Sequence, residues 1–185
     1  MIKQKQNYFL AQYNPTLSNE IALRNSVKAA VQHNLLYSKS TKIKHRTLIG
    51  AYWRNSLIEI GRNFHYQVDE RDYETLIEAL KTRMNDDFGE LFQESNKCTS
   101  GFRISHAQKS ISIYIKYLWC MSVIPEPQIC PIDRLILKKT EARKFNDTSW
   151  TFVNSIEEHR RKFQYIKQAA NKANQSIAAW ELLNF

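Results

Sequence analysis

Apolar residues recur along much of the chain at steps of three and four, the spacing that gathers them on one face of a helix. This pattern predicts helices over about residues 19–36, 49–64 and 156–177. Asp69 and Asp72 precede another helical stretch and offer it an N-terminal cap. The apolar stripes are Leu23, Val27, Ala30, Val31 and Leu35, then Ile49, Trp53, Leu57, Ile60 and Phe64, then Tyr73, Leu76, Ile77, Leu80 and Met84, and last Ile156, Phe163, Ile166, Ala170, Ala173 and Ile177.

Stretches that lack this spacing are predicted to be irregular. Residues 1–15 are polar with a few aromatics and end at a proline, so we expect an extended arm. The basic run 38–46 is predicted to be a loop, and residues 88–92 a short helix. Residues 94–105 are predicted to be a polar connector that bends at Gly101.

The apolar run that starts at Ser105 fits two periods. Ile111, Ile113 and Ile115 alternate as in a strand, whereas Ile111, Ile115 and Leu118 repeat as in a helix. The run is too long and too apolar for an edge strand, so we predict a buried helix capped by Ser105. No other segment requires a sheet, and the predicted fold class is therefore all-α.

Three prolines separate this helix from the next one. Pro125, Pro127 and Pro131 favour an extended loop because proline cannot continue a helix interior. The following helix is predicted to carry Pro131 in its first turn, with Asp133 close behind.

Composition narrows the class of protein. The chain has 185 residues, enough for a single domain or for two helical lobes in one chain, and 43% hydrophobic residues exclude a disordered chain. Three cysteines at irregular spacing do not suggest a disulfide framework. Neither a signal peptide nor a membrane-spanning run is evident, so we expect a monomeric protein of the cytoplasm, associated with the nucleoid if the source is prokaryotic.

The charge is unevenly distributed. Residues 69–94 hold nine acidic and three basic side chains, whereas the rest of the chain holds nine acidic and 24 basic ones. A basic surface favours a polyanionic partner because binding releases counterions. The sequence therefore indicates one solvated acidic face on an otherwise basic protein.

The region 94–138 carries the most informative motif. A polar segment with Gly101 leads into a helix whose first turn is predicted to contain Lys109, and a proline-rich loop then delivers Pro131-Ile132-Asp133 to the next helix. This order resembles the helix-hairpin-helix DNA glycosylase superfamily, most closely its archaeal 8-oxoguanine glycosylase branch. In that superfamily a hairpin with glycine precedes a nucleophilic lysine, and a Pro-Val-Asp type motif supplies an aspartate. The compact Gly-hydrophobic-Gly of the usual hairpin is absent here.

The resemblance implies two helical lobes with the active site at their junction, and a base-excision enzyme of DNA repair that flips its target nucleotide. Lys109 would be the nucleophile, and Asp133 would stabilise positive charge on the sugar. The substrate would be double-stranded DNA with an oxidised purine or another modified base, including bases of foreign DNA. A Schiff base at Lys109 would add abasic-site lyase activity to the hydrolase. Some relatives hold an iron–sulfur cluster with four cysteines, but here none follows Cys130, so we predict no metal and no cofactor.

Polar and basic residues around this motif are candidate DNA contacts. Arg134 could touch DNA or pair with the acidic face. The cluster Lys138, Lys139, Arg143 and Lys144 fits a DNA-backbone patch or a solvated helix end, and the stretch 159–162 is similar. At the hairpin, the candidates are Gly101, Arg103, Ser105, His106 and Gln108, together with the backbone N–H groups of residues 101–107.

Two other functions stay open. The chain could be a helical DNA-binding module without chemistry, which would keep the basic face and the hairpin. It could also be a helical protein-interaction domain that presents the acidic segment 69–94 to a basic partner. Five aromatic residues could include a stacking wall for a flipped base, although most are expected in the core: Trp53, Phe64, Trp119, Trp150 and Trp180.

Overall fold

A computed structural model describes residues 1–33, 35–93 and 101–185. These residues form the helices and 3-10 turns α1 (Ile2–Tyr13), α2 (Asn19–Val31), α3 (Ile43–Asn63), α4 (Glu70–Phe88), η1 (Gly89–Leu91), α5 (Ile104–Cys120), α6 (Arg134–Leu137), η2 (Glu141–Arg143), α7 (Ile156–Lys172) and α8 (Ile177–Asn184). Among the described residues, β-type pairing is limited to one isolated antiparallel bridge between Tyr37 and Phe92. The all-α prediction is confirmed.

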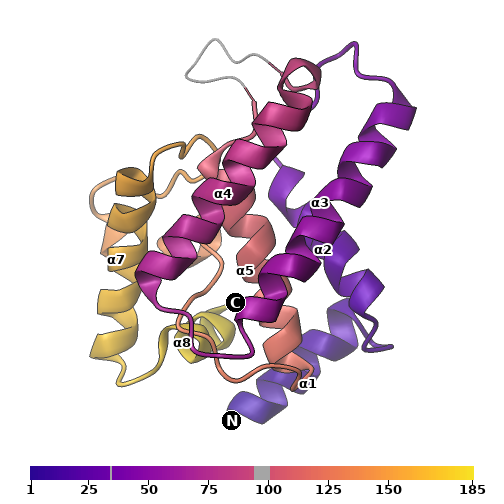
Figure 1. Cartoon of the computed structure of the whole chain (residues 1–185). Coiled ribbons are helices and arrows are strands. Elements are labelled where there is room, and N and C mark those ends of the chain that lie inside the picture. Colours follow the sequence, from indigo (N-terminus) through magenta and orange to yellow (C-terminus); the bar gives the residue numbers. More distant parts are fainter. Residues whose placement is uncertain (34, 94–100) are drawn as a thin grey trace.

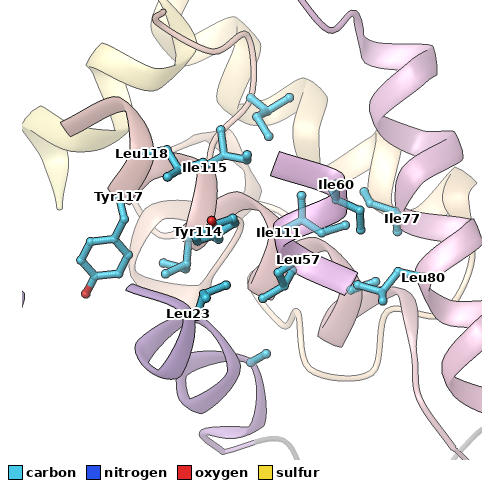
Figure 2. Packing of buried hydrophobic residues seen from close by; sticks show 14 of the residues in the cluster. Leu23, Leu57, Ile60, Ile77, Leu80, Ile111, Tyr114, Ile115, Tyr117 and Leu118 are labelled. Carbon is cyan, nitrogen blue, oxygen red and sulfur yellow. The ribbon is translucent and has the colours of Figure 1, made fainter. Parts of the chain in front are cut away.

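Helix α5 runs through the middle of the molecule, with α2 and α3 on one side and α7 on the other (Figure 1). Every one of its 17 residues is buried. Ile111 and Tyr114 of α5 belong to the same buried cluster as Leu57 of α3, Leu80 of α4 and Leu23 of α2 (Figure 2). The prediction of a buried helix is therefore confirmed, and neighbours on all sides explain why the apolar pattern of this segment looked ambiguous.

The buried apolar residues form two clusters. The larger one joins α1 to α5 and reaches Ala178 and Leu182 of α8. The smaller one gathers α6, α7 and their connections around Trp150 and Trp180. Helix α8 therefore contributes to both clusters.

The N-terminal segment differs from its prediction. Residues 2–13 form helix α1 instead of an extended arm, and Gln6, Phe9 and Leu10 are buried. The ring of Phe9 packs against Tyr117 of α5, with 4.9 Å between the centroids. Only one narrow stripe of α1 is apolar, so periodicity alone did not reveal the helix.

Several helix ends also differ from the sequence-based ranges. Helix α2 stops at Val31, and Leu35 is 73% exposed. The predicted loop 38–46 ends early because α3 begins at Ile43. The predicted short helix at 88–92 is the 3-10 turn η1, and the predicted helix 156–177 is divided between α7 and α8.

The two helices that carry the glycosylase-like motif begin differently from the predictions. Helix α5 is capped by Arg103 and not by Ser105, because the Nδ1 atom of His106 accepts a hydrogen bond from the Arg103 N–H at 3.1 Å. Helix α6 begins only after Asp133, which leaves Pro131 outside its first turn. The connector residues 94–100 lie outside the described part of the chain.

Candidate active site

Lys109 and Asp133, which the resemblance pairs functionally, are in direct contact. The Lys109 Nζ atom lies 2.7 Å from Oδ2 of Asp133, although 24 residues separate them. Lys109 is in the second turn of α5 and not in the first as predicted. The two side chains are 7% and 14% exposed, so the ion pair is largely withdrawn from water.

Asp133 has a second task at the start of α6. Its Oδ1 atom accepts a hydrogen bond from the Ile136 N–H at 2.9 Å and so caps the helix. Burial alone would raise the pKa of Asp133, but the Lys109 ammonium and the Ile136 N–H outweigh burial and hold that pKa below its usual range. Asp133 is therefore a carboxylate at neutral pH, with one oxygen on the lysine and the other on the helix.

Gln108 fixes the loop that carries Asp133. Its Nε2 donates a hydrogen bond to the carbonyl oxygen of Ile132 at 3.0 Å, and its Oε1 accepts one from the Ile132 N–H at 3.3 Å. One amide thus satisfies both backbone groups of the residue before Asp133. Gln108 was predicted to contact DNA, but it is 2% exposed and acts inside the protein as a brace for this loop.

Trp150 is the member of the predicted aromatic set that lies at this site. Its ring centroid is 5.5 Å from the Lys109 Nζ atom, within reach of a cation–π contact. The other four aromatic residues of that set are buried in the two clusters, as expected for core side chains.

A second buried ion pair on α5 was missed by the sequence analysis. Lys116 contacts Glu181 of α8 at 2.8 Å, and both side chains are at most 3% exposed. The Lys116 Nζ atom also lies 4.8 Å from the ring centroid of Phe9 and 3.9 Å from that of Phe185. One feature of the sequence pointed to Lys116 itself, though not to its partner. Lys116 follows Lys109 by seven residues, and residues seven apart lie on the same face of a helix.

The other predicted hairpin contacts are buried as well. Arg103 is 3% exposed, and Ser105 and His106 are fully buried. Arg103 Nε and Ser105 Oγ both donate to the carbonyl oxygen of Thr151, at 3.2 and 2.8 Å. Their predicted contact with DNA is therefore corrected, since these side chains tie the start of α5 to the loop before α7.

The backbone at Gly101 is also engaged within the protein. Gly101 has φ +88°, and its N–H bonds to the carbonyl oxygen of Gln93 at 3.2 Å. The amide of Asn85 bonds to both backbone groups of Phe102, each at 2.8 Å. The Ser105 N–H donates to Val153 at 2.9 Å. These N–H groups are therefore not free to bind phosphate, contrary to the sequence-based prediction.

Three basic candidates lie at the surface. Arg134, Lys138 and Lys139 are exposed, and within the described residues they have no ion pair. Among the described residues, Arg134 forms no ion pair with the acidic segment 69–94, so the suggestion that it pairs with the acidic face finds no support.

Basic side chains of the stretch 159–162 form ion pairs within the protein. Arg160 binds Glu74 of α4 at 2.7 Å, and Lys162 binds Asp147 at 2.5 Å. Lys167, further along α7, binds Glu70 of α4 at 2.5 Å. Two carboxylates of the acidic segment thus face α7, which weakens the case for that segment as a docking face for a separate protein.

Within the described residues, no group of three His, Cys, Asp and Glu side chains is arranged to hold a metal ion. None of the helices in this part of the chain has an apolar stretch that would reach across a membrane. No protein-family model, curated protein or solved structure gave a match to this chain.

Proposed function

We propose that the protein is a DNA glycosylase of the helix-hairpin-helix type that removes a modified base and forms a Schiff base through Lys109. The observation that carries the proposal is the contact between Lys109 and Asp133 at 2.7 Å. Lys109 comes from the central helix α5, and Asp133 comes from the N-terminal cap of α6, after the proline-rich loop. The lysine precedes the aspartate, as the resemblance requires. The two apolar clusters, which both include residues of α8, are consistent with two helical lobes.

In this account Lys109 first passes its ammonium proton to the base of an extruded nucleotide, and the neutral amine then attacks C1′. The N-glycosidic bond breaks, and the base leaves with the bonding electron pair. Asp133 stabilises the positive charge that develops on the sugar and takes the proton that the new C–N bond displaces from nitrogen. Sugar ring opening then gives the Schiff base, from which strand cleavage at the abasic site can follow.

The environment of the pair suits this chemistry in two ways. The low pKa of Asp133 keeps this side chain an anion near neutral pH, which suits the stabilisation of positive charge on the sugar. The pair is largely buried beside Trp150, so the attraction between the Asp133 carboxylate and a cationic sugar would be screened little by water.

Borohydride trapping on duplex DNA with one abasic site tests the proposal. Wild-type protein should give a covalent adduct, and Lys109→Gln should give none while still binding DNA. Lys109→Arg is the matched control, because it keeps a cation beside Asp133 but cannot form an imine. Circular dichroism must show that both variants fold. Equal trapping by wild type and Lys109→Arg would refute the role of Lys109.

The second candidate is a DNA-binding module without chemistry. The low exposure of Lys109 and Asp133 favours this candidate, because a buried ion pair can have a purely structural role. It predicts tight DNA binding, no adduct with any abasic substrate and no base release from modified DNA.

A further inference from the structure

A basic cavity opens on the side of the molecule formed by η2 and α7. It has a volume of about 260 Å³, and five cationic side chains line it: Lys138, Lys139, Arg143, Lys144 and Lys172. We refer to these five residues as the basic cavity. Glu141 is the single carboxylate in the lining, and it bridges Lys144 at 2.7 Å and Lys172 at 3.7 Å. One acid cannot neutralise five bases, so the cavity attracts anions.

An aromatic pair borders the same cavity. Tyr165 lines it, and the ring of Phe145 stacks on Tyr165 with 6.2 Å between centroids and 24° between planes. Phe145 is 68% exposed, so one face of this pair is available to a partner. A large exposed aromatic ring beside a cationic cavity combines the two elements that hold single-stranded nucleic acid.

The turn that presents Phe145 is held in place. Asn146 has φ +55°, and the Asp147 N–H donates to the carbonyl oxygen of Ala142 at 2.9 Å. The Asp147 carboxylate binds Lys162 at 2.5 Å and Arg161 at 3.0 Å. The backbone next to Phe145 is therefore held in place before any partner arrives, which lowers the entropy lost on binding.

The basic cavity is adjacent to the candidate active site along the chain. Asp133 caps α6, and Lys138 directly follows this helix. A four-residue helix rises by about 6 Å, so a strand held at the cavity lies near the Asp133 end of the site.

We propose that the basic cavity and the Phe145–Tyr165 pair bind an unpaired stretch of DNA. The five cations contact consecutive phosphates, and Phe145 stacks on an exposed base. A free anion would use the cations but not the aromatic face, and an acidic protein surface would gain little from a flat ring. This inference does not depend on the Lys109 chemistry, because no residue of the Lys109–Asp133 pair takes part.

Fluorescence titration with a 12-nucleotide single strand tests the inference, with 2-aminopurine at one position as the probe. Stacking on Phe145 should quench the probe. Phe145→Leu should remove the quenching and weaken binding about tenfold, whereas Phe145→Tyr should keep both. Because Phe145 is largely exposed, neither variant should disturb folding.

Salt dependence tests the charged half of the surface. Each lost phosphate contact should reduce the slope of log K against log salt by about 0.7, so the double variant Lys138→Gln/Lys139→Gln should lower it by about 1.4. The matched control is Lys42→Gln/Lys44→Gln, which removes the same charge at the exposed start of α3, on the opposite side of the view in Figure 1. The control should leave the slope unchanged.

Three results would overturn the inference. The first is an equal effect of both lysine pairs, which would mean diffuse attraction by net charge. The second is unchanged quenching in Phe145→Leu. The third is tighter binding to phosphatidylserine vesicles or polyglutamate than to the oligonucleotide, which would assign the surface to a membrane or an acidic protein. Lys109→Gln should bind the strand like wild type, so failure of the glycosylase chemistry and failure of this inference can be told apart.

Discussion

At the scale of single residues, Asp133 links the candidate chemistry to stability. Its carboxylate holds both the Lys109 ammonium and the first turn of α6. Asparagine caps helices about as well as aspartate, so Asp133→Asn removes the charge while keeping the cap.

Asp133→Asn should destabilise the protein by on the order of 3 kcal/mol at pH 7, because it leaves the Lys109 cation buried without its counter-charge. The pKa of Asp133 is lowered in the folded state, so its contribution is present above the usual aspartate range and is lost as pH falls through the lowered value. Urea unfolding at pH 7, 5 and 3 should therefore show the wild-type advantage shrink only at the most acidic pH. An advantage that grows on acidification would contradict this assignment.

Gly101 is the one glycine with positive φ, among the residues that the structure describes. A Cβ atom there would lie 2.3 Å from Oδ1 of Asn85, the group that holds Phe102 before α5. Gly101→Ala should cost about 2 kcal/mol of unfolding free energy. Gly89→Ala is the matched control, since Gly89 has helical φ and ψ and open space around it, and it should be neutral or slightly stabilising. Equal denaturation midpoints for the two variants would argue against a strained turn at Gly101.

At the scale of elements, α5 is tied to the rest of the protein by buried charge as well as by apolar packing. Lys116 reaches α8 through Glu181, and burial raises the pKa of Glu181 against the opposing effect of the Lys116 ammonium. Such a pair need not stabilise the fold, but removing one partner leaves a charge in the core.

Glu181→Gln should therefore cost about 3–5 kcal/mol, whereas the double variant Lys116→Met/Glu181→Leu should recover most of the loss. The comparison pair is Arg83–Glu59, where side chains 47% and 57% exposed predict less than about 1 kcal/mol for Glu59→Gln. Chemical denaturation of wild type, Glu181→Gln, the double variant and Glu59→Gln measures these differences in unfolding free energy. If the double variant were no more stable than Glu181→Gln, the packing of α8 on α5 would require the ion pair itself, and the loss in Glu181→Gln would not come from an unpaired buried charge.

The elements also show how far sequence patterns reached. The apolar stripes of α3 and α4 were predicted because each helix buries one continuous stripe, and Asp69 caps α4 as expected, although α3 begins at Ile43, inside the predicted loop. Helix α1 was missed because its few apolar residues pack against α5, a contact between distant segments. The pairing of Lys109 with Asp133 followed from a family resemblance, not from periodicity.

The sequence could not separate buried from exposed polar residues. Arg103, His106 and Gln108 looked like DNA contacts beside a catalytic lysine, but all three are buried. Long-range hydrogen bonds hold Arg103 and Gln108, and a local bond to the Arg103 N–H holds His106. Glu181 lies 65 residues from Lys116, so no local pattern reveals their pair. The basic cavity likewise forms where α7, which carries Lys172, packs against η2, two segments that are distant in the sequence.

At the scale of the whole molecule, internal pairing changes the meaning of the charge pattern. Glu70 and Glu74 of the acidic segment engage Lys167 and Arg160 of α7. The basic residues that follow α6 have fewer carboxylate partners among the described residues and gather around one cavity. The five cations and one carboxylate of the cavity lining therefore leave a local excess of positive charge that would attract a nucleic acid strand.

The most direct test of the account is to locate the covalent bond. Wild-type protein would be reduced with borohydride on abasic duplex DNA, digested with a protease and a nuclease, and analysed by mass spectrometry. The account predicts that the sugar remnant is on Lys109 and that Asp133→Asn lowers the yield of this adduct. A remnant on another lysine or on the N-terminal amine, with Lys109 unmodified, would contradict it.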